Sequence, residues 1–157
     1  MKLTLLNTGK TDVPYLQSGI SDYAKRISHL IDFNVKDLPV KKISRNESPQ
    51  QLCIREGEII KKHIAGFDRI VLLDERGREF GSRDFAGWIQ QQMNQGIRQM
   101  AFITGGAWGF SDELYKLADF KLSLSKMTLT HQMVRLLFTE QLYRAMTLIN
   151  GIPYHND

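Results

Sequence analysis

The sequence predicts an α/β protein with a mostly parallel sheet flanked by helices. Short apolar segments bounded by charges or glycines alternate with longer segments in which apolar residues recur at helical spacing. Strands that alternate with helices form parallel sheets, because each helix returns the chain to the edge where the next strand begins. With 157 residues, 42% hydrophobic and 24% charged, the chain has the length and composition of one globular domain, residues 1–157.

Five elements are predicted in the first half of the chain. Residues 2–8 form a short apolar strand, and residues 12–29 form a helix that opens with an acidic cap and an early proline. Residues 31–38 alternate apolar and polar side chains, as in a half-buried strand. A serine–proline pair starts a second helix at residues 48–66, and a glycine ends it. Residues 68–74 are a continuous apolar run bounded by charges, which is typical of a strand buried on both faces.

The second half continues this alternation. Residues 82–94 form a helix capped by the serine at its start, and residues 99–104 form another buried strand. Ser111 begins a short helix, and residues 120–124 form the last strand. The long helix at residues 131–149 completes the order of strands and helices that a parallel sheet requires.

Three predicted loops follow strand ends in the second half. The first begins at Asp74 and is turn-rich through residue 81, the second is the glycine-rich stretch 105–109, and the third is the hydroxyl-rich stretch 125–130. Ligands of parallel α/β sheets bind outside the carboxyl ends of the strands, where such loops diverge. The sequence therefore predicts a binding site on these three loops.

Each loop also has an ordinary interpretation. A glycine-rich turn is structural about as often as it is functional, and only its place at a strand end favours a site here. The segment 124–129 has small hydroxyl side chains between Leu and Met, with no period of 2 or 3.6. Such a segment suits a small, partly apolar ligand. Composition alone favours a plain connection in which Thr128 or Thr130 caps the next helix.

Composition excludes several classes of protein. One cysteine, Cys53, allows no internal disulfide and indicates a reducing compartment. The four histidines show no paired ligand spacing, so we expect no metal site. No apolar run approaches membrane-spanning length and the N-terminus has no signal-peptide pattern, so we expect a cytoplasmic protein without a membrane partner. A net charge of +4 weakly favours a polyanionic partner.

The last helix carries charged residues on two faces. His131 and Arg135 are four positions apart and share one face, whereas Glu140 and Arg144 share another. Because most other side chains of this helix are apolar, it has too little polar surface to lie freely in water. We expect its charged residues to line a site or a subunit contact.

The motifs of the last third of the chain resemble a known family. They are residues 104–110 (TGGAWGF), residues 122–131 (LSLSKMTLTH), Arg135, residues 140–145 (EQLYRA) and residues 153–155 (PYH). Together they are similar to the ribosomal RNA large subunit methyltransferase H family, a pseudouridine N3-methyltransferase group of the SPOUT superfamily. The likeness spans nearly the whole chain, including its MKL start and the strand end at residues 72–74.

The resemblance implies a SPOUT-type α/β fold whose C-terminal part is a deep trefoil knot, and an obligate homodimer that binds S-adenosylmethionine. The positions that match the family's cofactor residues are Leu73, Gly105, Leu124, Ser125, Lys126, Met127, Thr128 and Leu129. The implied substrate is a pseudouridine of 23S rRNA, recognised on the assembled ribosome. One departure is Thr130, where many relatives carry proline, and it concerns the rigidity of the loop.

Several roles follow as hypotheses from this resemblance. His131 is the first candidate for deprotonating N3, and His155 with Tyr154, delivered across the dimer, is the second. Arg135 and Arg144 are expected to hold phosphate or a base carbonyl, with Glu140 orienting one of them. The expected RNA surface consists of Lys25, Arg26, Lys41, Lys42, Arg45 and the C-terminal tail.

Two other functions remain open from the sequence. One is a noncatalytic ribosome-binding or assembly factor that keeps the fold. The other is a SPOUT methyltransferase that acts on transfer RNA. The intact cofactor segment argues against the first.

Overall fold

The computed structural model describes residues 1–40 and 47–155. Lys41, Lys42 and Arg45, which belong to the expected RNA surface, lie outside the described residues. The elements alternate along the chain as β1 Lys2–Thr8, α1 Pro14–Ser28, β2 Asp32–Leu38, α2 Pro49–Ile64, β3 Arg69–Glu79, α3 Ser82–Asn94, β4 Gln99–Thr104, α4 Asp112–Leu117, β5 Phe120–Ser123 and α5 Met133–Ile149.

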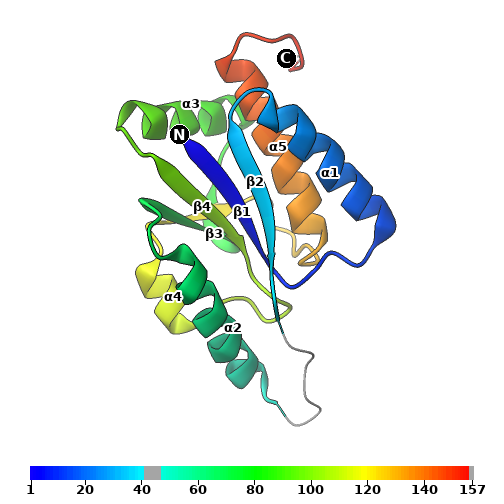
Figure 1. The fold of residues 1–157 in the computed structure, drawn as a ribbon, viewed down its shortest axis with the longest axis vertical. Coiled ribbons are helices and arrows are strands. Elements are labelled where there is room, and N and C mark those ends of the chain that lie inside the picture. Colours follow the sequence, from blue (N-terminus) through cyan, green and yellow to red (C-terminus); the bar gives the residue numbers. More distant parts are fainter. Residues whose placement is uncertain (41–46, 156–157) are drawn as a thin grey trace.

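The five strands form one parallel sheet in the order β2-β1-β4-β3-β5, which confirms the predicted fold class (Figure 1). β1, β4 and β3 have neighbours on both sides and helices on both faces, so nearly all residues of β1 and β4 are buried, as are Val71, Leu72 and Leu73 of β3. The carboxyl ends of β3, β4 and β5 meet at one edge of the sheet. The threading of the C-terminal segment through a knot stays a prediction, because strand order does not define it.

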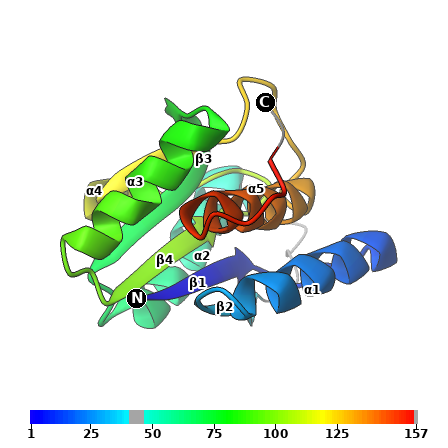
Figure 2. The same ribbon diagram turned by 90° about the horizontal axis from the view of Figure 1, so that it is seen from above.

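Helices cover both faces of the sheet. One core packs Phe85 of α3 and Phe138 of α5 against one face of the strands, and α1 closes this layer with Ile27. α5 lies between α1 and α3 (Figure 2). On the other face, a second core packs Ile60 of α2 and Leu114 of α4 against the strands. The functional loops emerge between these two layers.

Local sequence explains where α2 and α4 begin. The Ser48 hydroxyl accepts the backbone N–H of Gln51, and the Gln51 side chain accepts the Ser48 N–H, which makes a reciprocal cap at the start of α2. Ser111 accepts the Leu114 N–H at the start of α4. Both helix starts were predicted from serine.

Three predicted details are wrong. Asp12 does not cap α1, because the N-cap is Val13, and the Asp12 N–H donates instead to Gln132 at 2.9 Å. Ser82 is the first helical residue of α3, whose N-cap is Gly81. The turn-rich loop predicted after Asp74 is a continuation of β3 through Glu79.

The extension of β3 has a physical cause in its pairing with β5. The register shifts between Leu73 and Arg78, and Arg78 then pairs with Leu122. Gly77 lies in the shifted stretch, where a Cβ would lie 2.6 Å from the carbonyl carbon and oxygen of Lys121. Only glycine lets the two backbones approach this closely.

Candidate functional site

A cavity of about 620 Å³ lies beyond the carboxyl ends of β4 and β5, beside the middle of β3. Its walls are the three segments predicted as loops, the first of which is part of β3, together with the first turn of α5. The lining comprises residues 73–76, residues 104–110, Leu122, Leu124, Ser125, residues 127–131 and Val134. The volume lies within the range of small-molecule and cofactor sites, about 300–1,000 Å³.

The structure brings most of the predicted cofactor residues to this cavity. Those that line it are Leu73, Gly105, Leu124, Ser125, Met127, Thr128 and Leu129. Lys126 is not among the lining residues. Its side chain is 87% exposed, and its ammonium lies 3.9 Å from a carboxylate oxygen of Glu79. A direct contact of the Lys126 side chain with a cofactor is therefore not supported.

The glycine-rich wall is a tight turn. The Gly109 N–H donates to the Gly106 carbonyl at 3.2 Å, and Gly109 has a φ of +79°, which favours glycine. A Cβ on Gly105 would lie 3.2 Å from the Gly109 carbonyl oxygen. The backbone segments at Gly105 and Gly109 therefore lie close together, and a side chain on Gly105 would crowd Gly109.

Hydroxyl groups hold the opposite wall. The Ser123 hydroxyl donates to the Ser125 carbonyl at 2.9 Å, and the Ser125 hydroxyl accepts the Met127 N–H at 2.9 Å. The Thr130 hydroxyl accepts the Met133 N–H at 3.2 Å, just before α5, whose N-cap is Gln132 and not Thr130. The wall is therefore fixed by its own side chains rather than by a strand partner.

The third wall is acidic and ties the other two together. The Thr128 hydroxyl donates to Glu75 at 2.8 Å, which links β3 to the hydroxyl-rich segment. Asp74 accepts a hydrogen bond from the Tyr115 hydroxyl, which links β3 to α4. Arg76 donates to the same hydroxyl at 2.9 Å. Burial, followed by the hydrogen bond to Asp74, raises the pKa of Tyr115 to about 12, so Tyr115 remains a donor at neutral pH.

Sequence reasoning placed the segment from Asp74 onward at the site without naming Asp74 or Glu75 as site residues, and it missed Tyr115. The rule that ligands gather at strand ends did include the loop from Asp74 onward, so Asp74 and Glu75 could have been found by the same argument. Tyr115 carried no such signal, because α4 brings it to the wall only in the folded chain.

His131 lies at the rim of the cavity, just before α5. Burial lowers the pKa of His131, the positive charge of Arg135 lowers it further, and Asp12 partly opposes this. The imidazole is therefore neutral at neutral pH, with one ring nitrogen able to accept a proton. The structure supports the placement predicted for this residue.

Arg135 is placed differently from the prediction. Its side chain is fully buried (0% exposed), and it donates to the Thr11 hydroxyl at 2.8 Å and to the Thr8 carbonyl at 2.7 Å. Among the described residues its Nε has no hydrogen-bond partner. The guanidinium satisfies polar groups just beyond the end of β1, so the prediction that it contacts RNA is wrong.

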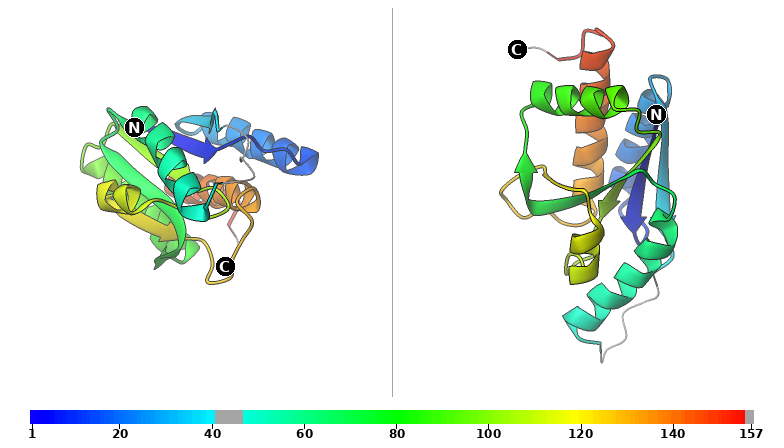
Figure 3. Two further views of the ribbon diagram at one scale, coloured as in Figure 1. Left: turned by 90° about the horizontal axis from the view of Figure 1, so that it is seen from below. Right: turned by 90° about the vertical axis from the view of Figure 1, so that its left-hand side faces the viewer.

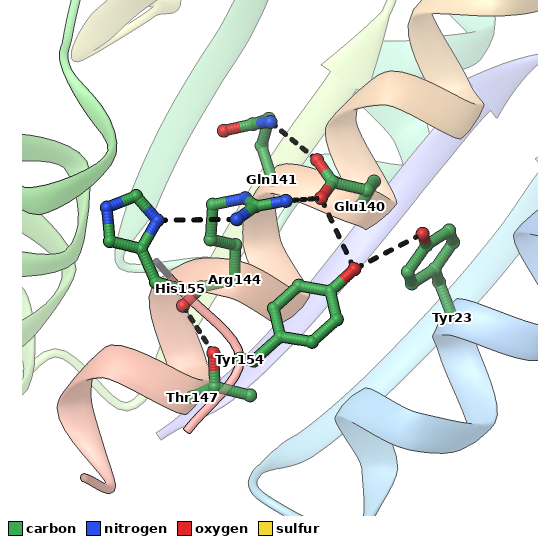
Figure 4. Close-up of polar contacts among 7 residues, drawn as sticks. All are labelled: Tyr23, Glu140, Gln141, Arg144, Thr147, Tyr154 and His155. Carbon is green, nitrogen blue, oxygen red and sulfur yellow. Dashed lines mark hydrogen bonds and ion pairs between the residues drawn. The ribbon is translucent and has the colours of Figure 1, made fainter. Parts of the chain in front are cut away.

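The remaining predicted residues form a second cluster at the far end of α5 (Figure 4). Arg144 pairs with Glu140 at 2.5 Å and donates to Nδ1 of His155 at 3.3 Å. The Tyr154 hydroxyl lies 3.5 Å from both Glu140 and Tyr23. The hydrogen bond with Tyr23, followed by burial, raises the pKa of Tyr154 to about 12. Glu140 and Arg144 are 18% and 25% exposed, so this is a half-buried network.

The two sets of residues do not meet within one chain. From Val134 to Arg144 the helix rises by about 15 Å at 1.5 Å per residue. Figure 3 shows the segment before α5 at one end of the helix and the C-terminus beyond the other. The cavity therefore contains His131, whereas Arg144, Tyr154 and His155 lie away from it.

The expected RNA surface is only partly described. Arg26 pairs with Asp22 at 2.9 Å, and its guanidinium lies over the Tyr143 ring. Lys25 lies beside it in the last turn of α1. Among the described residues there is no group of three or more His, Cys, Asp or Glu side chains that could hold a metal. No helix in the described ranges is long and apolar enough to cross a membrane.

Comparison with solved structures supports the fold. The chain is similar to a probable methyltransferase from Bordetella pertussis, with a TM-score of 0.55 and 10% identity, covering 92% of this chain and 93% of that one. It is also similar to a probable methylase family protein from Haemophilus influenzae, with a TM-score of 0.51 and 13% identity, covering 96% and 66%. At these identities the likeness concerns the fold alone.

Comparison of sequences identifies the family. The model of the family described as predicted SPOUT methyltransferase matches residues 1–155. The chain is 46% identical to the ribosomal RNA large subunit methyltransferase H of Phocaeicola vulgatus over the full length of both proteins. It is also 46% identical to the protein of that name from Christiangramia forsetii, over 99% of each. The chain therefore belongs to the SPOUT methyltransferases, in the family of the ribosomal RNA large subunit methyltransferase H proteins.

Proposed function

We propose that this protein methylates N3 of a pseudouridine in 23S rRNA, on the assembled ribosome in the cytoplasm, using S-adenosylmethionine. The observation that carries the proposal is the cavity, which gathers the predicted cofactor loops and His131 at one edge of the sheet. The large-subunit RNA as target rests on the family's relatives, which bear that activity in their name. We propose that residues 1–157 act as a single domain.

The cavity suits S-adenosylmethionine in size and chemistry. The walls at Leu73, Leu124 and Leu129 are apolar, and the close turn at Gly105 exposes backbone groups for hydrogen bonds. Asp74 and Glu75 add carboxylates, which favour a ligand with a positive sulfonium. The bound cofactor would supply a methyl group activated by that sulfonium.

The chain itself has to remove the N3 proton and align the base. His131 is the proton acceptor in this proposal, because its imidazole is neutral and lies at the rim of the cavity. His155 is less suitable, because its Nδ1 already accepts a hydrogen bond from Arg144, which can only donate. Tyr154 stays protonated at neutral pH. A positioned base of this kind contributes roughly 10²- to 10⁴-fold to the rate.

We further propose that two copies of the chain form a composite site. The network of Arg144, Tyr154 and His155 lies about 15 Å along α5 from the cavity of its own chain, so it cannot join that site. In a homodimer the network of one protomer would face the cavity of its partner. Arg144 would then hold phosphate or a base carbonyl as a planar donor.

Ribosomes provide the decisive test of the activity. Ribosomes from cells lacking this protein would be incubated with the purified protein and S-adenosylmethionine, and their 23S rRNA and the transfer RNA would be digested for mass spectrometry. We expect one additional methyl group on a pseudouridine of 23S rRNA. Methylation of transfer RNA alone would support the other SPOUT activity. Absence of any methylation, with no heat on titration of S-adenosylmethionine, would favour the noncatalytic assembly factor.

A mixture of two inactive variants tests the composite site. His131→Ala removes the cavity histidine, and His155→Ala removes the C-terminal one. A mixed dimer contains one site with both histidines, so mixing the variants is expected to restore activity that neither has alone. If sedimentation shows a monomer, or if mixing restores nothing after subunit exchange, the composite site is wrong.

A further inference from the structure

Trp108 is an exposed aromatic side chain at the cavity. It belongs to the glycine-rich turn, lines the cavity, and is 61% exposed. The other tryptophan, Trp88, is in a different environment, because it is partly buried against the core, with ring centroids 4.9 Å from Phe120 and 5.9 Å from Phe80. Trp108 therefore has no comparable structural role, and its indole lies at the mouth of the site.

The backbone beneath Trp108 is fixed although its ring is exposed. Residues 106–109 form the turn closed by the hydrogen bond from Gly109 to Gly106, at 3.2 Å. The Cys53 thiol of α2 donates to the Trp108 carbonyl at 3.3 Å. A flat ring on an anchored turn loses little conformational freedom when another flat group stacks on it.

A second exposed apolar side chain borders the same cavity. Met127, on the hydroxyl-rich wall, is 77% exposed. Trp108 and Met127 thus come from the loops after β4 and β5 and provide apolar surface at the mouth. A base that leaves an RNA helix to reach an enzyme site loses stacking, and aromatic side chains commonly replace that loss.

We propose that Trp108 stacks on a nucleobase of the RNA substrate at the mouth of the cavity, either the target base or its neighbour. This inference rests on the proposed function, because it needs an RNA substrate at this site. The indole is exposed at the mouth, whereas a ring that packs on a bound cofactor would lie on the floor of the cavity. Its exposure therefore favours RNA over the cofactor as its partner. Trp108 is then a substrate-binding residue, and its contribution is to positioning the base.

Steady-state kinetics on ribosomes test this role. Removing an aromatic ring that stacks on a base weakens RNA binding by about 5- to 150-fold. Trp108→Ala is expected to raise KM for ribosomes by that factor, with little change in the affinity for S-adenosylmethionine measured by calorimetry. Trp108→Phe keeps a ring and should retain most of the wild-type KM.

Ile54 provides a matched control. It is 53% exposed and lies on α2 outside the cofactor cavity, so Ile54→Ala removes apolar surface without touching the mouth. An unchanged KM in Trp108→Ala would overturn the proposal. Equal losses in Trp108→Ala and Ile54→Ala would instead indicate a general apolar docking surface. A loss of S-adenosylmethionine affinity as large as the change in KM would place the indole on the cofactor.

Tryptophan fluorescence gives a readout that does not depend on catalysis. An RNA stem-loop containing pseudouridine is expected to quench the emission of the wild-type protein, and S-adenosylmethionine alone is not. The quenching should disappear in Trp108→Phe, whose remaining tryptophan, Trp88, is packed against the core by aromatic neighbours away from the cavity. Quenching that persists in this variant contradicts stacking on Trp108. If the wild-type protein fails to methylate ribosomes, the proposed function is refuted. The fluorescence measurement would still show whether RNA stacks on Trp108.

Discussion

Replacing Arg135 by alanine distinguishes support of the fold from contact with RNA. Its buried guanidinium donates to Thr11 at 2.8 Å and to the Thr8 carbonyl at 2.7 Å. Hydrogen bonds from a charged donor contribute about 1.5–3 kcal/mol each, so both together contribute about 3–6 kcal/mol. Burial lowers the pKa of Arg135, which indicates a desolvation cost that offsets part of this gain. We expect a net loss of about 2–4 kcal/mol in the free energy of unfolding.

Thermal unfolding at fixed protein concentration measures this loss. For a chain of this size, about 2–4 kcal/mol corresponds to a fall in Tm of roughly 4–16 °C. Arg135→Met is the matched variant, because it keeps most of the side-chain volume and removes the two hydrogen bonds and the charge. We expect Arg135→Met to lie between the wild type and Arg135→Ala. An unchanged Tm in both variants, together with a higher KM for ribosomes, would refute our reasoning and return Arg135 to the RNA surface.

Three further predictions concern the pairing of β3 with β5, the Glu75–Thr128 hydrogen bond and the protonation of His131. Gly77→Ala places a Cβ 2.6 Å from backbone atoms of β5. We expect it to lower the free energy of unfolding, measured by urea titration, by about 1–3 kcal/mol. Gly87→Ala is the control, because a Cβ at Gly87 would meet no atom within 4 Å and should not lower the free energy of unfolding. Glu75→Ala removes the hydrogen bond that holds Thr128 and should weaken S-adenosylmethionine binding by roughly 2- to 12-fold in calorimetry, with Glu75→Gln less affected. The pKa of His131 is lowered, so the single-turnover methylation rate should rise with pH only below the ordinary histidine pKa and be flat above it. In His131→Ala the rise at low pH should disappear. An unchanged pH profile in this variant would exclude His131 as the base.

The sequence predicts best the strands that are buried along nearly their whole length and the helix start that is capped by neighbouring residues. The bounds of β1 and β4 are as predicted, Lys2–Thr8 and Gln99–Thr104. Both strands lie between other strands and under helices on both faces, so every residue after the first of each strand is buried. The start of α2 was equally clear, because its cap is made by residues within three positions of each other. Short-range chemistry and uniform burial are visible in a sequence.

The end of β3 was mispredicted because its partner is remote. Residues 75–79 contain glycine and charged side chains, a composition typical of turns. Their strand conformation depends on pairing Arg78 with Leu122, more than forty positions later. The error about Arg135 has the same origin, since its carbonyl acceptor on Thr8 is 127 positions away. Helical spacing showed that Arg135 shares a face of α5 with His131, but it could not show that Arg135 contacts the end of β1.

The hydroxyl-rich wall explains why a binding segment can lack any periodicity. A strand or helix repeats because its backbone hydrogen bonds repeat, and its side chains follow that period. Here each hydroxyl has a separate partner: the nearby Ser125 carbonyl for Ser123, the nearby Met127 N–H for Ser125, and the remote Glu75 carboxylate for Thr128. Composition alone could not distinguish this arrangement from an ordinary connection, because hydroxyls are common in both. The distinction lies in the Thr128–Glu75 link, which ties the segment to β3 and makes it a wall of the cavity.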